Sequence, residues 1–185
     1  MKRYLMPPSP DIVFDPPCPL YASNARQNIL EIGSGTGYLS LSLAPLLSPN
    51  STLTLTDLHE VLPLLATNLA QARGRWMSSI HPSYLPTIKV EGLPWGDEEA
   101  LRNLSLNIED PEFIIAADLV YFPFLYPPLL RTLIGLTTPR SPESSSPTVL
   151  FAGKVRSLAR EEPFWSAFGE PELSTGWPVI NTQTS

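Results

Sequence analysis

The sequence predicts a single α/β domain built on a doubly wound, mostly parallel sheet. Five short strand patterns alternate with helical patterns, which is the order expected for parallel strands joined by right-handed crossovers. The chain has 185 residues, of which 43% are hydrophobic, so one core is sufficient and two full domains are not expected.

The first strand and helix of this pattern begin after Asn28. Residues 29–32 form a mostly apolar run closed by Gly33, as expected for a strand buried on both faces of a parallel sheet. Leucines recur at helical spacing through residues 38–47 and Pro49 follows, so a helix is expected over this segment.

The second strand and the second helix follow directly in the sequence. Residues 52–57 alternate threonine with leucine and finish in Asp57, which predicts a strand with a carboxylate at its end. A helix is expected over about residues 60–73, with Pro63 tolerated in its first turn. Residues 74–86 are expected to be a loop.

Three further strands complete the pattern. Residues 87–91 form a short strand pattern, 113–118 repeat the buried apolar run that ends in an acid, and 148–152 supply the fifth strand. Helices are expected over 126–136 and 159–168, where apolar residues recur at helical spacing.

Proline is unevenly distributed and divides the chain into three parts. The total is 22, and residues 1–27 carry prolines at positions 7, 8, 10, 16, 17 and 19 without a useful apolar pattern, so an extended, Pro-rich arm is expected there. Residues 28–168 form the predicted domain, which contains a Ser/Pro-rich loop at 138–147. Residues 169–185 are expected to be an irregular tail.

Composition limits the partners and the compartment. Lys and Arg total 12 against 18 Asp and Glu, a formal net charge of -6, which argues against nucleic acid as a partner. The single Cys18 cannot form an internal disulfide, and no signal peptide or membrane span is recognisable. We therefore expect a monomer in the cytoplasm or nucleus. No metal site is expected, because His59 and His81 lack partners at ligand spacing.

Gly33, Gly35 and Gly37 lie between the first strand and the first helix. Glycine there permits a tight turn and lets a ligand lie against the backbone near a helix N-terminus. Tyr38 stands where the dinucleotide fingerprint requires Gly or Ala, and no lysine follows as in a Walker motif. A nucleoside without a pyrophosphate is therefore favoured over NAD, and a turn without any ligand is the alternative.

Two further positions suit a nucleoside. Asp57, at the end of the second strand, is placed to accept both hydroxyls of a ribose, with a helix N-cap as the alternative. Trp95 and Asp97, in the loop after the third strand, can supply an apolar wall and an acceptor for an adenine ring, with simple core packing as the alternative for the tryptophan.

With its glycine loop and with Asp57 at the end of the second strand, the sequence resembles a known family, the class I S-adenosylmethionine-dependent methyltransferases. More narrowly, it is similar to the seven-β-strand lysine methyltransferases grouped as family 16 (METTL21-like). The resemblance spans about residues 28–168, and its most specific parts are P-W-G at 94–96 and D-x-x-Y at Asp118 and Tyr121. The stretches that carry it are 30–37, 56–58, 61–65, Asn68, 93–96 and 116–121.

The resemblance implies a Rossmann-like class I methyltransferase fold, S-adenosyl-L-methionine as the cofactor, and a protein substrate that presents a lysine. The cofactor contacts that it implies are Glu31, Gly33, Ser34, Gly35, Gly37, Asp57, Leu58, Trp95 and Ala117. The catalytic residues that it implies are Asp118 and Tyr121, which would lie toward the substrate.

The chemistry of the last two residues suits an amine. Asp118 can attract and orient a cationic side chain, and Tyr121 can present its hydroxyl and ring to the same pocket; an N-cap and plain packing are the respective alternatives. Methyltransferases that act on planar amides or base nitrogens commonly have two prolines where this chain has Leu119 and Val120. The resemblance therefore favours lysine over an amide or a nucleic acid.

Two regions depart from the family. Residues 1–27 contain no tryptophan, whereas similar members have a Trp-containing segment that closes over the cofactor. Residues 169–185 are too short and polar for the antiparallel strand pair that completes the family's sheet. Two other functions therefore stay open: a class I methyltransferase for a small molecule, and a truncated, inactive remnant that binds a cofactor or a partner.

The last helix is expected to have a charged face and an apolar face. The aromatic residues at helical spacing, expected to be core, are Phe164, Trp165 and Phe168. The charged residues expected on a solvated face are Arg156, Arg160, Glu161 and Glu162.

Overall fold

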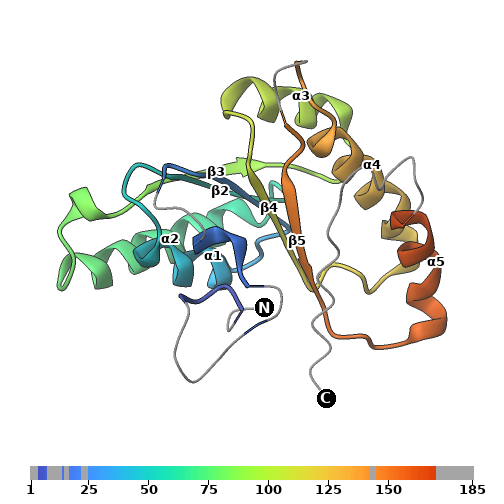
Figure 1. Cartoon of the computed structure of the whole chain (residues 1–185), viewed down its shortest axis with the longest axis horizontal. Helices are drawn as coiled ribbons and strands as arrows, with labels where there is room; N and C mark the ends of the chain where they lie inside the picture. The colour runs from blue at the N-terminus through green and yellow to red at the C-terminus, as the bar shows by residue number, and fades with distance from the viewer. Residues whose placement is uncertain (1–3, 8–13, 15–16, 22–24, 142–144, 170–185) are drawn as a thin grey trace.

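The computed structural model describes residues 4–7, 14, 17–21, 25–141 and 145–169. Its centre is one five-stranded sheet with the order β3-β2-β1-β4-β5, in which every neighbouring pair of strands is parallel (Figure 1). The predicted doubly wound α/β fold is therefore confirmed.

All five strands lie where the sequence predicts them. Their bounds are Asn28–Ile32 (β1), Thr52–Asp57 (β2), Thr87–Gly92 (β3), Phe113–Ala117 (β4) and Thr148–Ala152 (β5). The helices are Tyr38–Leu43 (α1), Leu62–Met77 (α2), Glu98–Asn107 (α3), Tyr126–Thr137 (α4) and Leu158–Phe168 (α5).

Each face of the sheet has its own apolar core, because successive strand residues point to opposite faces. Ile29 and Leu53 pack with the leucines of α1 and α2 on one face. Leu30 and Ile114 pack with α3, α4 and α5, which lie on the other face (Figure 1). Phe164 is fully buried there. The prediction that the aromatic residues of the last helix are core is confirmed for Phe164 and Phe168, whereas Trp165 is half-buried against that core.

Described parts of the N-terminal arm also belong to the first core. Leu5 and Leu20 are fully buried, and the Tyr21 hydroxyl donates a hydrogen bond to the carbonyl oxygen of Leu5 (2.7 Å). The amide of Gln27 donates to the carbonyl of Leu20 (3.0 Å). These parts of the arm are therefore packed against the α1 and α2 face. Residues 170–185 of the predicted tail lie outside the described residues.

Two helices differ from their predicted bounds by more than one residue. α1 ends at Leu43 and continues as a 3-10 turn, Ala44–Leu46, because Pro45 has no N–H to continue the α-helical hydrogen bonds. α2 starts at Leu62, keeps its proline in the first turn, and runs through Gly74 to Met77. The loop predicted at 74–86 is correspondingly shorter.

The helix α3 is absent from the sequence prediction. Oδ1 of Asp97 accepts hydrogen bonds from the backbone N–H groups of Glu99 and Ala100, both at 2.9 Å, and therefore caps the helix. Glu98 and Glu99 lie in the first turn, where their negative charges stabilise the helix further by interacting with its dipole. Oδ1 of Asp97 therefore serves the helix, and the role of Asp97 as an acceptor for an adenine ring stays a prediction.

Two negative findings apply to the described residues. None of their helices is long and apolar enough to cross a membrane. They also hold no group of three or more His, Cys, Asp and Glu side chains that could bind a metal ion.

The cap at Asp97 predicts a specific loss of stability. Replacing Asp97 by alanine removes both accepted hydrogen bonds and is expected to lower the free energy of unfolding by about 1 kcal/mol. Asp97→Asn is the matched control, since an amide oxygen accepts the same bonds. Urea titrations followed by circular dichroism test this; equal midpoints for the alanine and asparagine variants would contradict the capping role.

Candidate functional site

The site is built on a loop that only glycine can form easily. Gly33, Gly35 and Gly37 have φ angles of +62°, +56° and +74°, in the left-handed region that other residues avoid. Gly37 ends the loop as the N-cap residue of α1, and a Cβ atom there would lie 2.6 Å from a methyl group of Leu65. A Cβ on Gly35 would meet nothing within 4 Å, so the space beside the middle of the loop is open.

Hydrogen bonds fix this loop to β1 and β2. Ser34 donates its N–H to the Thr56 carbonyl (2.9 Å), and the Ser34 hydroxyl accepts the N–H of Thr56 (3.2 Å). The hydroxyls of both residues donate to the carbonyl of Glu31. From α2, the amide of Asn68 donates to the carbonyl of Thr36 (2.9 Å). The buried Ser34 therefore serves the loop's own structure through its hydroxyl.

Asp57 lies at the end of β2 and faces the glycine loop. Its Oδ2 accepts the N–H of Gly35 at 2.6 Å, and its Oδ1 accepts the N–H of Leu58 at 2.7 Å. The side chain of Leu58 is exposed. The N-cap of α2 is Val61, without any side-chain cap, so the alternative of Asp57 as a helix cap is wrong.

Glu31 is a buried acid beneath the loop. It is 2% exposed, and burial raises the pKa of its carboxyl to about 7, with a further rise from the charge of Asp57. The nearby hydroxyls of Ser40 and Ser34 lower this pKa, but by less than burial raises it. Even so, Oε2 of Glu31 and the Ser40 hydroxyl have no hydrogen-bond partner of good geometry. Glu31 therefore keeps a buried acceptor that no described residue uses, in the strand that leads directly into the glycine loop.

The loops after β3 and β4 complete this edge of the sheet. A Cβ on Gly33 would lie 2.7 Å from Leu119 and 3.0 Å from the ring of Trp95, so both side chains pack directly on the glycine loop. Trp95 is half-buried against the second core. Gly96, with φ of +81°, turns the Trp95 loop and donates its N–H to the Thr132 hydroxyl (2.8 Å). Ala117, also half-buried, ends β4.

Asp118 follows β4 in an unusual backbone conformation. Its φ is +59°, the only positive value among non-glycine residues that the structure describes, and its N–H donates to the carbonyl of Ala152 (2.7 Å). The next helical segments are capped by Phe122 and Leu125, so Asp118 is not an N-cap and that alternative is wrong.

The side chain of Asp118 is paired with an arginine that the sequence analysis missed. Nη2 of Arg156 lies 2.6 Å from Oδ2 of Asp118, and the guanidinium carbon lies 5.7 Å from the centre of the Tyr121 ring. Arg156 is solvated, as predicted, but it precedes α5 and therefore lies on no face of that helix. The prediction of a solvated face is wrong for Glu161, which is 3% exposed and accepts the N–H groups of Arg156 and Ser157.

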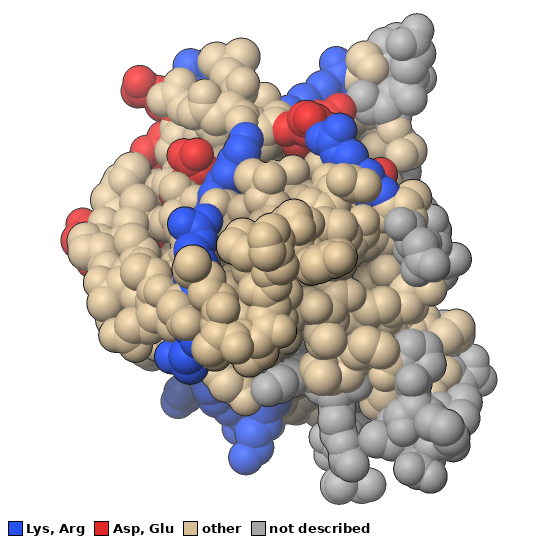
Figure 2. Space-filling model, turned by 90° about the vertical axis from the view of Figure 1, so that its left-hand side faces the viewer, with Lys and Arg blue, Asp and Glu red and all other residues tan. Residues whose placement is uncertain are grey.

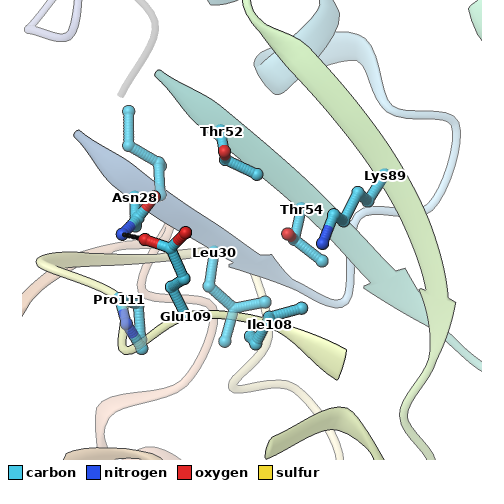
Figure 3. A pocket seen from close by; sticks show the side chains of 9 residues that line it. Asn28, Leu30, Thr52, Thr54, Lys89, Ile108, Glu109 and Pro111 are labelled. Atoms are coloured by element: carbon cyan, nitrogen blue, oxygen red, sulfur yellow. Dashed lines mark hydrogen bonds between the residues drawn. The ribbon is translucent and has the colours of Figure 1, made fainter. Parts of the chain in front are cut away.

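The pocket at the opposite edge of the sheet is not part of this site. It lies among the first residues of β1 and β2, where the amide of Asn28 donates to Glu109 (3.0 Å) and Lys89 lines the wall (Figure 3). Its volume of ≈ 30 Å³ is close to that of one water molecule, so it cannot hold a nucleoside.

The sheet order, the glycine loop after β1 and the acid at the end of β2 define a Rossmann-like α/β protein, a class that binds nucleotides at this edge of the sheet. Comparison with known sequences then gives the family. A model of the lysine methyltransferase family matches residues 19–169, and this chain belongs to that family.

Curated relatives agree with the match but are longer. The human methyltransferase-like protein 21E pseudogene is 36% identical over 176 residues, 89% of this chain and 57% of its own. Mouse protein-lysine methyltransferase METTL21E is 36% identical, with 84% and 57% covered. Protein-lysine N-methyltransferase EFM6 of Saccharomyces cerevisiae is 27% identical, with 75% and 54% covered. The chain thus spans little more than half the length of these relatives.

The buried carboxyl predicts a pH dependence of stability. The pKa of Glu31 is raised from 4.5 to about 7 in the folded chain, so the folded state binds the proton more tightly than the unfolded state. Stability is therefore expected to fall as the pH rises from about 4.5 to 7, by up to about 3 kcal/mol.

Urea unfolding of the ligand-free chain at pH 5 and pH 8 measures this contribution. Glu31→Gln is expected to flatten the dependence and to be more stable than the unsubstituted chain at pH 8. Glu98→Gln on the exposed start of α3 is the matched control and should keep the full dependence. Identical pH profiles for the unsubstituted chain and Glu31→Gln would contradict the assignment.

Proposed function

We propose that this chain is an S-adenosyl-L-methionine-dependent protein-lysine N-methyltransferase. The observation that carries the proposal is that two groups of residues lie side by side at the carboxyl ends of the strands, one suited to a cofactor and one suited to a lysine. An acid, a glycine loop and a second acid lie on β1 and β2, and Asp118 with Tyr121 follows the neighbouring β4. Family membership supports the proposal, as do the relatives named protein-lysine methyltransferases.

The residues present fit such a cofactor. Asp57 still has acceptor capacity for ribose hydroxyls, because each carboxylate oxygen accepts one hydrogen bond and has a second lone pair. The unpartnered Oε2 of Glu31 suits an amino group beside the glycine loop. Leu58 and Trp95 provide apolar surface for an adenine ring. The cofactor supplies an electrophilic methyl group on a sulfonium.

Asp118 and Tyr121 form the part of the site that would bind the substrate lysine. A lysine arrives protonated at neutral pH, and the carboxylate of Asp118 attracts the ammonium while the Tyr121 ring lies beside it. The ammonium must lose one proton to solvent before its nitrogen lone pair forms the new N–C bond and the old S–C bond breaks. Alignment of amine and methyl group is the main contribution that these residues make.

The rim of the site favours a macromolecular substrate over a small molecule. Tyr121, Phe122 and Phe124 are 38%, 51% and 72% exposed directly after β4, and Phe122 stacks on Phe124. An open aromatic rim is typical of a docking surface for another protein.

We infer further that the chain acts as a monomer in the cytoplasm or nucleus, without nucleic acid. The net charge of -6 supports the absence of nucleic acid, and the single cysteine supports a reducing compartment. On the face seen in Figure 2, acidic and basic side chains lie around a broad uncharged centre.

Product analysis tests the proposed reaction. The chain is incubated with tritiated S-adenosylmethionine and a protein extract, and the labelled protein is hydrolysed to amino acids. We expect the label in N-methylated lysine. Label confined to small molecules, or to glutamine or arginine, would contradict the proposal.

We expect Asp118 to affect the rate of methyl transfer and not the affinity for the cofactor. Asparagine tolerates positive φ better than alanine, so Asp118→Asn removes the charge with little change of backbone. The variant is expected to lose at least about tenfold in kcat/KM for the protein substrate. Its affinity for S-adenosylhomocysteine should stay within about twofold of the unsubstituted value, because the residue faces the substrate. Equal losses in both would contradict this role.

A further inference from the structure

Arg156 lies in the segment between β5 and α5, yet its side chain reaches the end of β4. β4 and β5 pair with Ala117 opposite Ala152, and the N–H of Asp118 donates to the Ala152 carbonyl, which places the two segments side by side. The guanidinium then lies 2.6 Å from the Asp118 carboxylate and 5.7 Å from the centre of the Tyr121 ring.

The backbone of Arg156 is held firmly while its side chain stays accessible. Oε1 of the buried Glu161 accepts the N–H groups of Arg156 (2.7 Å) and Ser157 (3.1 Å). The side chains of Arg156 and Asp118 are 50% and 54% exposed. The arginine can therefore leave the carboxylate by side-chain rotation alone, without movement of the sheet or of α5.

The contacts of Arg156 are those that a substrate lysine needs. Guanidinium and ammonium groups both bind carboxylates through charged N–H donors, and both bind the faces of aromatic rings. We propose that Arg156 is a specificity-determining residue, an internal cation that occupies Asp118 and Tyr121 until a substrate lysine displaces it. This inference rests on the proposed function, because that function assigns Asp118 and Tyr121 to the lysine.

Displacement makes the site selective among cations. An exposed ion pair and an exposed cation–π contact are each weak, so a lysine that gains further contacts on the aromatic rim can replace the arginine. A free amine without such contacts has to compete with a cation that is tethered to the same chain. A neutral amide side chain has no charge with which to displace the guanidinium.

The proposal is tested by the binding of n-butylammonium, an analogue of the lysine side chain. NMR titration of the full chain follows the Tyr121 ring signals, assigned with Tyr121→Phe. Arg156→Gln is expected to bind the probe about three- to tenfold more tightly than the unsubstituted chain, since its competitor is removed. Arg156→Lys, which keeps a tethered cation, should bind it about as weakly as the unsubstituted chain.

Two controls separate displacement from general charge effects. Lys154→Gln removes the same charge two residues away and should leave the probe affinity unchanged. Asp118→Asn added to Arg156→Gln should abolish the gain. Equal or weaker binding of n-butylammonium by Arg156→Gln, or an equal gain in Lys154→Gln, would overturn the proposal.

This experiment is independent of methyl transfer. It uses no S-adenosylmethionine, and the affinity of Arg156→Gln for S-adenosylhomocysteine reports separately on the cofactor half of the site. If the extract assay yields no methyl-lysine while Arg156→Gln still gains affinity for n-butylammonium, the proposed reaction fails, and what stands is that Arg156 competes with amines for Asp118 and Tyr121. The reverse pattern removes only the role of Arg156.

Discussion

The candidate site depends on the parallel pairing of β1 with a strand on each side. The register places Ile32, the last residue of β1, opposite Thr56 on β2 and Ala116 on β4. The three strands therefore end together, and the glycine loop emerges between Asp57 and Asp118. Because side chains alternate along a strand, a shift by one residue would turn the end of a neighbouring strand away from the loop. The geometry of the site is thus a property of the whole sheet.

Features that are unfavourable for stability gather at this same edge. The three loop glycines and Asp118 adopt left-handed backbone conformations, and Glu31 is a buried acid with an unsatisfied oxygen. Away from this edge, the described residues form one apolar core on each face of the sheet, with unsatisfied buried atoms at Asn28 and Tyr126 and a second buried acid at Glu161. Such a concentration is typical of a binding site, since a ligand can satisfy groups that the fold leaves open.

The sequence predicts the strands well because each has a local pattern that survives folding. The apolar run before Gly33 and the alternation over 52–57 are both read from a few residues. From the sequence, α3 is missed because its cap is interpreted as a ligand contact, although Asp97 followed by two glutamates is itself a helix-start signal. Arg156 could not be placed, because its partner is 38 residues away and meets it only through the pairing of β4 with β5.

Calorimetric titration of the ligand-free chain with S-adenosylhomocysteine, alongside Asp57→Asn, tests the account most directly. If Glu31, the glycine loop and Asp57 form one pocket, the unsubstituted chain binds at micromolar or lower concentration. The variant, shown by circular dichroism to be folded, then binds at least about tenfold more weakly, since the ribose hydroxyls lose their charge-assisted hydrogen bonds to the carboxylate. Absence of binding by the folded chain, or equal affinity of the two proteins, would contradict the account.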